Sequence, residues 1–283
     1  METRGNVVNI GILGLGLIGG SLAKAIRQNT EHSVWGSDQD PTVLAKAKML
    51  GAIDKELRPQ DFEKCDLLMI AIYPKDVLRF LKENASSFNP NGLVMDCCGV
   101  KEKICLEAFP LAKEFGFTFV GGHPMAGLEF SGFDASTKSL FQNASMIFTP
   151  LPDVQIAQLE WLKDLFLSIG FSHIEISTPE KHDKIIALSS QLAHVVSSAY
   201  IQSPSAMNHA GFSAGSFHDM TRVAELNEVL WSELFFANRE NLVSEIDGLI
   251  DRLKGYSQAL KNEDEDDLYR LLHQGRIRRL ELK

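Results

Sequence analysis

Apolar and polar positions follow two different patterns along this chain. In the first part, short apolar runs rich in β-branched residues alternate with segments in which apolar residues recur every three or four positions. The former predict strands and the latter helices. Strands are expected at 7–13, 34–36, 67–72, 93–96, 118–120, 146–149 and 174–176. Helices are expected between them, at 17–26, 41–50, 74–81, 101–114 and 155–168. This alternation predicts an α/β fold, a doubly wound parallel sheet with helices on both faces.

After residue 178 the strand pattern stops and only helical spacing remains. Helices are expected at 180–202, 220–226, 229–260 and 266–280. In the third of them, leucine and isoleucine recur at intervals of three and four residues, as a helix with a broad apolar face requires. We therefore predict a sheet domain over residues 1–178 and an all-helical domain over residues 179–283. So small a helical domain leaves apolar surface unburied, and we expect a homodimer joined through it.

Composition and charge exclude several classes of protein. The chain has 283 residues, of which 45% are hydrophobic and 23% charged, ordinary values for a folded protein. Its 28 Lys and Arg stand against 37 Asp and Glu, and the formal net charge of −9 disfavours nucleic acid as a partner. No apolar run reaches the roughly 18 residues of a membrane span, and the first residues lack the apolar region of a signal peptide. We therefore expect a cytoplasmic protein that binds neither a membrane nor nucleic acid.

The four cysteines, Cys65, Cys97, Cys98 and Cys105, all lie in the first half of the chain. None forms a Cys-x-x-Cys pair with a matching histidine cluster, so we predict no metal site. Buried, reduced thiols are the favoured interpretation, and a strained vicinal disulfide between Cys97 and Cys98 is the alternative.

A glycine-rich motif stands where the first predicted strand meets the first predicted helix, the context that marks a dinucleotide-binding site. Its residues are Gly14, Leu15, Gly16, Leu17, Ile18 and Gly19. The first glycine of such a motif permits a tight turn, the second lets the backbone approach a pyrophosphate, and the third lets the helix pack close to the strand. Asp38 ends the second strand, where a carboxylate binds an adenosine ribose and repels a 2′-phosphate. We therefore predict a Rossmann-type domain with NAD as its cofactor; a flexible glycine turn beside a helix-capping aspartate is the alternative.

His123 lies in a Gly-Gly-His-Pro-Met-Ala-Gly segment that follows the strand expected at 118–120. Its side chain should emerge at the carboxyl edge of the sheet, where a nicotinamide ring would lie. An imidazole has an unperturbed pKa of about 6.5, so near neutral pH it accepts a proton from a substrate hydroxyl while a hydride leaves the same carbon for NAD. We therefore predict that His123 is the catalytic base of an alcohol oxidation, and a structural histidine is the alternative.

The helical part carries further candidates for a substrate site. His182 and His194 are separated by twelve steps of about 100°, which is about 120° beyond three full turns of an α-helix, so we expect them on different faces. His194 is expected to face the cleft, and His182 to lie nearer the hinge between the domains. Arg222 is a candidate clamp for a substrate carboxylate. A surface ion pair of Arg222 with Asp219 or Glu225 is the alternative.

The order of these motifs resembles the prephenate dehydrogenases. The resemblance rests on the glycine-rich motif, on the His-Pro-Met-Ala-Gly that contains His123, and on Glu129 six residues after it. In the helical part it rests on His182-Asp183, His194, Asp219-Met220-Thr221-Arg222 and Trp231. The likeness covers nearly the whole chain. It implies oxidative decarboxylation of prephenate to 4-hydroxyphenylpyruvate with reduction of NAD, a step of tyrosine biosynthesis.

The resemblance also implies roles for the substrate-binding residues. His123 would be the catalytic base, and Arg222 would bind a substrate carboxylate. Asp219 would orient Arg222, and His194 would contact the side-chain end of prephenate.

Three further residues would complete this site. Glu129 would act as a gate at the mouth of the cleft. Trp231 would close one wall near the substrate or at the dimer contact. Lys101 would add positive charge for a dianionic substrate.

Two positions depart from the family pattern. Gly99 stands where members often have a serine, so the hydroxyl expected beside the base or the substrate is absent. In a motif that often reads Ser-His-Leu-Pro-His, Gln191 replaces the first histidine and Ala193 the proline. These changes affect the expected contacts of the substrate but not the expected reaction class.

Three other functions are compatible with the sequence. An arogenate dehydrogenase would perform the same chemistry on an amino acid. A different two-domain β-hydroxyacid dehydrogenase would need a lysine base in its helical half, whereas His123 is the better placed base here. A catalytically silent NAD-sensing dimer would bind NAD and regulate a partner without turnover of a substrate.

Overall fold

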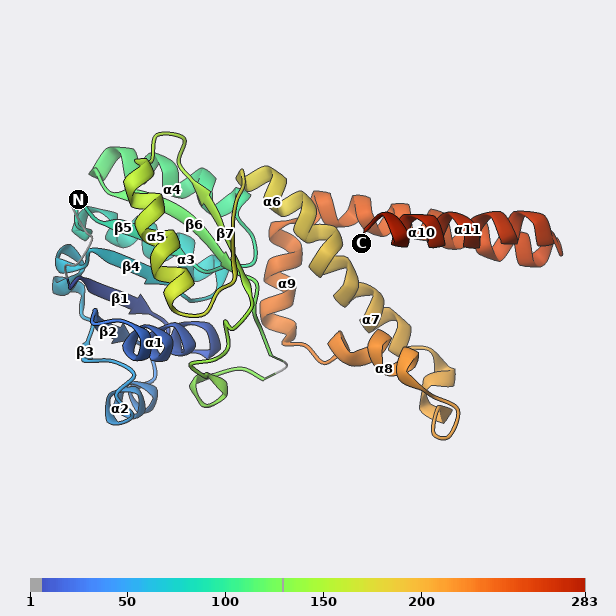
Figure 1. Ribbon diagram of the computed structural model, residues 1–283, viewed down its shortest axis with the longest axis horizontal. Helices are drawn as coiled ribbons and strands as arrows, with labels where there is room; N and C mark the ends of the chain where they lie inside the picture. Colours follow the sequence, from blue (N-terminus) through green and yellow to red (C-terminus); the bar gives the residue numbers. More distant parts are fainter. Residues whose placement is uncertain (1–6, 129, 283) are drawn as a thin grey trace.

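The computed structural model describes residues 7–128 and 130–282. Its first part is a sheet with helices on both faces, and its second part consists of helices (Figure 1). The expected α/β fold followed by a helical part is thus confirmed. Within the described residues no helix is long and apolar enough to cross a membrane.

The sheet has the strand order β3-β2-β1-β4-β5-β6-β7-β8. Its strands are β1 (Asn9–Leu13), β2 (Ser33–Ser37), β3 (Lys55–Glu56), β4 (Leu67–Ile70), β5 (Leu93–Asp96), β6 (Thr118–Pro124), β7 (Ser145–Pro150) and β8 (His173–Ile176). From β1 the chain first adds β2 and β3 on one side and then β4, β5 and β6 on the other. The carboxyl ends of β1 and β4 therefore flank a topological switch point, the usual place for a ligand in such a sheet.

One pair departs from the expected parallel arrangement. β6 and β7 run antiparallel, while β7 and β8 are parallel to each other. β6 also continues to Pro124, beyond its expected end at Val120, because its last residues pair with β7. His123 is opposite Ile147 in this pairing, so it lies inside the strand rather than in the loop after it.

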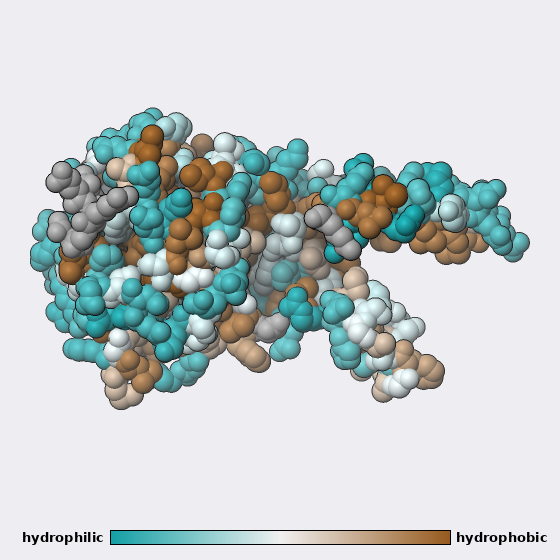
Figure 2. All heavy atoms as spheres, viewed as in Figure 1, coloured by the Kyte–Doolittle hydropathy of each residue, from teal (hydrophilic) through white to brown (hydrophobic). Residues whose placement is uncertain are grey.

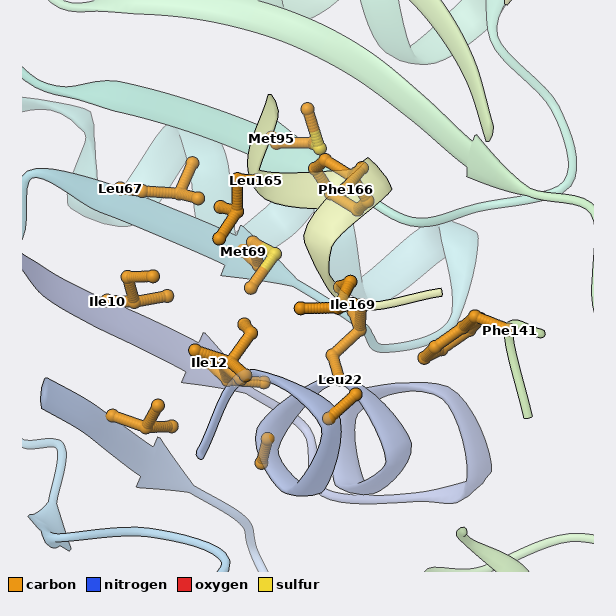
Figure 3. Close-up of a cluster of buried hydrophobic side chains, with 14 of the residues drawn as sticks. Ile10, Ile12, Leu22, Leu67, Met69, Met95, Phe141, Leu165, Phe166 and Ile169 are labelled. Carbon is orange, nitrogen blue, oxygen red and sulfur yellow. The ribbon is translucent and has the colours of Figure 1, made fainter. Parts of the chain in front are cut away.

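Helices cover both faces of the sheet. They are α1 (Leu17–Asn29), α2 (Pro41–Met49), α3 (Pro74–Asn84), α4 (Glu102–Phe115) and α5 (Ile156–Ser168). Figure 3 shows the core under α1 and α5, where Ile12 of β1, Leu22 of α1 and Phe166 of α5 are all fully buried. Val77 of α3 and Ile104 of α4 belong to a second core on the opposite face. Burial on both faces explains why the central strands read as uninterrupted apolar runs.

The helices of the second part are α6 (Pro179–Ile186), α7 (Ala193–Ile201), α8 (Gly215–Thr221), α9 (Glu228–Ala237), α10 (Arg239–Lys261) and α11 (Glu265–Glu281). A π-helical turn, Ala187–Leu192, joins α6 to α7. The helix expected at 220–226 is wrong, because α8 ends at Thr221 and a 3₁₀ turn, Arg222–Ala224, follows it. The helix expected at 229–260 is divided at Asn238.

Two pairs of helices project from the body of the molecule, α7 with α8 and α10 with α11 (Figure 1). α10 carries apolar side chains that are at least 43% exposed, namely Val243, Ile250, Leu253 and Leu260. Figure 2 shows hydrophobic residues along the underside of the projection formed by α10 and α11. An apolar stripe of this kind on a monomer indicates an interface.

Candidate active site

The glycine-rich motif forms the turn between β1 and α1, at the carboxyl edge of the sheet. Gly14 has a φ of +86°, which residues with a side chain rarely adopt, and its N–H donates to Ser37 O (2.8 Å). Gly16 precedes α1 without a side-chain cap. The first N–H groups of α1 therefore lack intrahelical partners and suit a phosphate group.

The other members of the motif shape the space around this turn. A Cβ on Gly16 would meet no atom within 4 Å, whereas a Cβ on Gly19 would lie 1.8 Å from Gly14 O. Gly16 thus borders open space, and Gly19 allows α1 to pack against the turn. Leu15 is fully buried and its N–H is bonded to Asp38. Leu17 and Ile18 form the first turn of α1 and offer backbone N–H groups to a ligand.

Asp38 follows β2 directly and lies next to the glycine turn. One of its carboxylate oxygens accepts from Leu15 N–H (2.8 Å) and the other from Asp40 N–H (3.0 Å). These bonds orient the carboxylate and leave it further capacity as an acceptor. The turn and Asp38 together fit the pyrophosphate and the ribose of a dinucleotide.

His123 is joined to a histidine of the helical part. His123 Nδ1 lies 2.9 Å from His182 Nε2, and His182 Nδ1 lies 2.7 Å from an oxygen of Asp183. The Asp183 carboxylate also accepts from the backbone N–H groups of Lys101 (2.7 Å) and Glu102 (2.9 Å) at the start of α4. The sheet domain and the helical part therefore meet at these three side chains.

The order of these bonds fixes which nitrogen of His123 is free. Asp183 accepts hydrogen bonds only, so His182 Nδ1 carries the proton and His182 Nε2 is the acceptor. His123 must then donate from Nδ1 to His182 Nε2, which leaves His123 Nε2 with an unprotonated lone pair. A histidine held in this tautomer is ready to accept a proton from a substrate.

Burial keeps this histidine pair neutral. Burial, with the neighbouring His182 and Lys101, lowers the pKa of His123 well below its ordinary value of 6.5. Burial also lowers the pKa of His182, although its hydrogen bond to Asp183 acts in the opposite direction. Both imidazoles are therefore uncharged at neutral pH.

The direction of these shifts predicts the pH dependence of catalysis by His123. The fraction of the unprotonated base falls as the pH drops through a pKa that lies below 6.5. We expect kcat/KM on the acid side to stay constant down to pH 6.5 and to decline only below it. Steady-state rates from about pH 5 to about pH 8 measure this profile. A fall of kcat/KM toward low pH with its midpoint above pH 6.5 would contradict the assignment of His123 as the base.

Lys101 does not face this site. Its side chain is fully buried and forms an ion pair with Asp96. Burial opposes the charge, but Asp96 raises the pKa of Lys101 above its ordinary value. A buried, paired ammonium adds no net positive charge for a substrate, so the expected role of Lys101 is wrong.

His194 and Trp231 form the second cluster of the helical part. Their ring centroids are 3.7 Å apart, and His194 Nδ1 donates to Ser190 O (2.9 Å). Burial and, after it, the positive charge of Arg222 lower the pKa of His194. Arg222 is exposed in the 3₁₀ turn after α8, and Asp219 is exposed on α8. Glu129 lies outside the described residues.

Helix α9 connects the two clusters. Leu234 follows Trp231 by three residues and so shares its face of α9. A Cβ on Gly99 would lie 3.3 Å from Leu234 Cδ2 and 3.7 Å from His123 Nε2. Gly99, which stands where the family often has a serine, therefore lies directly beside the free nitrogen of His123.

The sequence identified His123 but missed its partner. His182 was expected near the hinge, and nothing in a spacing of 59 residues indicates that the two rings are bonded. The pairing of histidine with aspartate in His182-Asp183 was the available signal, because an adjacent carboxylate often orients an imidazole. Within the described residues no group of three or more His, Cys, Asp or Glu side chains is placed to hold a metal ion.

Two family models match the chain. Residues 22–175 match "Prephenate dehydrogenase, nucleotide-binding domain". Residues 178–274 match "Prephenate dehydrogenase, dimerization domain". The two matches together span most of the sequence.

Individual relatives agree with these models. The prephenate dehydrogenase of Bacillus subtilis strain 168 is 30% identical over 270 residues, which is 92% of this chain and 72% of that protein. The crystal structure of prephenate dehydrogenase from A. aeolicus in complex with hydroxyphenyl propionate and NAD+ has a TM-score of 0.84 and 28% identity, and the match covers 99% of this chain and 100% of that chain. The crystal structure of Synechocystis arogenate dehydrogenase has a TM-score of 0.83 and 26% identity, with 97% of this chain and 100% of that chain covered.

Proposed function

The chain belongs to the prephenate dehydrogenase family, and on this premise we propose that it converts prephenate to 4-hydroxyphenylpyruvate by NAD-dependent oxidative decarboxylation in tyrosine biosynthesis. It is an oxidoreductase with NAD as its cofactor. The observation that carries the proposal is the free lone pair of His123 Nε2, fixed by the bonds to His182 and Asp183.

In the proposed reaction, His123 Nε2 accepts the proton of the ring hydroxyl. The bond from His123 Nδ1 to His182 holds the ring in this tautomer, and Asp183 stabilises the positive charge that develops on the pair. NAD bound at the glycine turn and Asp38 supplies the hydride acceptor. The ring carboxylate leaves as carbon dioxide, and its electron pair completes the aromatic ring.

Arogenate is the second candidate substrate, and the similarity to the Synechocystis arogenate dehydrogenase favours it. Prephenate and arogenate share the reacting ring and differ at the side chain, a keto acid in one and an amino acid in the other. The deciding experiment compares kcat/KM for both substrates, with NAD and with NADP, by absorbance of the reduced cofactor. A higher value for prephenate with NAD supports the proposal, and turnover of arogenate alone overturns it. Binding of NAD without turnover of either substrate would favour the NAD-sensing dimer.

Replacing Arg222 with glutamine tests the proposed carboxylate clamp. A hydrogen bond to a charged group contributes about 1.5 to 3 kcal/mol, and because Arg222 is exposed we expect the lower end of this range, a rise in KM for the substrate of about tenfold. Neither kcat nor KM for NAD should change much, because the proposed clamp binds the substrate carboxylate and neither the base nor the cofactor. Steady-state kinetics measure both constants. An unchanged KM for the substrate would show that Arg222 has no such role.

The proposal extends to assembly and location. Residues 1–178 bind NAD, and residues 179–283 complete the substrate site and join two copies of the chain. The dimerization-domain match and the exposed apolar side chains of α10 support a homodimer. The four free cysteines suit a reducing compartment such as the cytoplasm.

A further inference from the structure

The helix that carries both His182 and His194 is not α-helical throughout. Between α6 and α7, residues Ala187–Leu192 form a π turn, against which α10 packs. A π turn closes its hydrogen bonds one residue later than an α turn and so contains one extra residue. Such turns occur frequently at functional sites.

The extra residue changes the direction of His194. In an uninterrupted α-helix, twelve steps would leave His194 about 120° away from His182. One extra residue removes about 100° of this rotation, so His194 returns to within about 20° of His182. The expectation that the two histidines lie on different faces is therefore wrong. His182 contacts His123 and His194 stacks on Trp231, and the π turn directs both rings to one side.

Two buried amide side chains brace this turn. Gln191 lies in the turn, accepts from Asn238 Nδ2 at Oε1 (2.9 Å) and donates from Nε2 to Leu234 O (3.4 Å). Asn238 also donates to Asp183 O (2.8 Å). The two amides are only 1% and 4% exposed. Because buried polar groups without partners are costly, these bonds favour the π turn over a regular helix that would break them.

The same turn contacts His194 directly. The carbonyl to which His194 Nδ1 donates is that of Ser190, a residue of the turn. The carbonyl to which Gln191 donates is that of Leu234, which lies three residues after Trp231 on α9. The turn and the aromatic partner of His194 are thus fixed to each other.

We propose that Gln191 and Asn238 are positioning residues, which hold the π turn so that His194 faces the substrate site. This inference rests on the proposed function, since His194 is there assigned to the side-chain end of the substrate. The side-chain hydrogen bonds of Gln191 and Asn238 run to each other, to Leu234 O, to Asp183 O and to Asn241. The two residues act on substrate binding through His194.

The kinetic test is a double-mutant cycle on Gln191 and His194. Gln191→Met keeps an unbranched side chain of similar size and removes both hydrogen bonds of the Gln191 side chain, to Asn238 and to Leu234 O. We expect this variant and His194→Ala each to raise KM for the substrate about tenfold and to leave kcat, its pH profile and KM for NAD nearly unchanged. If Gln191 acts through His194, the double variant has a KM no higher than the worse single variant. A KM in the double variant that equals the product of the two single effects would show that Gln191 and His194 act independently and would overturn the proposal.

A matched control is available on the same helix. Gln202 follows α7 and is exposed, and its amide donates only within its own helical segment, to Ser198. Gln202→Met should leave KM for the substrate unchanged. A rise in KM equal to that of Gln191→Met would indicate a general loss of helix integrity and contradict the positioning role.

A measurement without substrate separates this inference from the proposed function. Because His194 stacks on Trp231, the emission of Trp231 should change as His194 is titrated. Subtracting the spectrum of Trp231→Phe removes the signal of the other two tryptophans. We expect this pH-dependent change to persist in Gln202→Met and to vanish in Gln191→Met. Persistence in Gln191→Met would overturn the inference, whereas absence of turnover in the wild type would overturn only the function.

Discussion

Replacing His123 with asparagine should lower kcat about 10²-fold to 10⁴-fold, the usual cost of losing one general base. Asparagine keeps a polar side chain that can donate to His182 Nε2, the partner of His123 Nδ1. The asparagine side chain has no atom basic enough to accept the substrate proton in the place of His123 Nε2. Steady-state rates at saturating substrate and NAD measure the loss.

The controls for this variant separate catalysis from folding and cofactor binding. The dissociation constant of NAD should stay within about twofold of the wild type, because the His123 side chain is bonded to His182 whereas Asp38 is bonded to Leu15 and Asp40. His173→Asn changes an exposed histidine on β8, whose side chain is 62% exposed, and should leave kcat unaltered. A His123→Asn enzyme with wild-type kcat would remove the base from the proposed reaction. It would also weaken the case for the tautomer fixed by His182 and Asp183.

Replacing Gly16 with valine should abolish useful binding of NAD while leaving the free protein folded. A Cβ at this position meets nothing within 4 Å, so the side chain fits the protein without a ligand. It would occupy the space through which a pyrophosphate approaches the backbone. Loss of two charged hydrogen bonds of about 1.5 to 3 kcal/mol each corresponds to a weakening of at least about a hundredfold. Calorimetric titration with NAD measures the affinity.

At Gly19, in the same motif, a side chain should instead destabilise the fold itself. A Cβ on Gly19 would lie 1.8 Å from Gly14 O, a backbone atom that cannot move aside cheaply. We expect Gly19→Ala to lower the free energy of unfolding by about 1 to 3 kcal/mol even without NAD. Denaturant unfolding of both variants in the absence of NAD makes the comparison. Equal destabilisation by Gly16→Val and Gly19→Ala would show that the two glycines do not have these separate roles.

Elements whose signals are local were predictable from the sequence. Asp40 caps α2 by accepting from Thr42 N–H (2.8 Å), and Pro41 occupies the first position of the helix, as the residue types indicate. Leu93–Asp96 matches the expected strand because both of its faces are buried and its apolar run is continuous. In these cases the side chains that determine the structure lie within a few residues of it.

Features that depend on distant residues were not predictable in this way. The extension of β6 to Pro124 follows from pairing with β7, which begins only at Ser145. The π turn depends on Asn238, which lies 47 residues after Gln191. A count of α-helical steps therefore placed His194 on the wrong face. The bond between His123 and His182 likewise required the helical part to fold back onto the sheet.

The segment between β6 and β7 is tied into the core by Phe133 and Phe141, which are 4% and 0% exposed, but its first residues, 125–128, lie largely at the surface. β6 ends and β7 begins at the same edge of the sheet, so this segment leaves and re-enters beside the strand that bears the base. Exchanging the exposed residues at 125–128 would alter the surface beside the reacting atoms without removing these core side chains or shifting the strand register. A descendant of this chain would therefore be able to acquire a new substrate by remodelling this short exposed stretch while inheriting its proton acceptor intact.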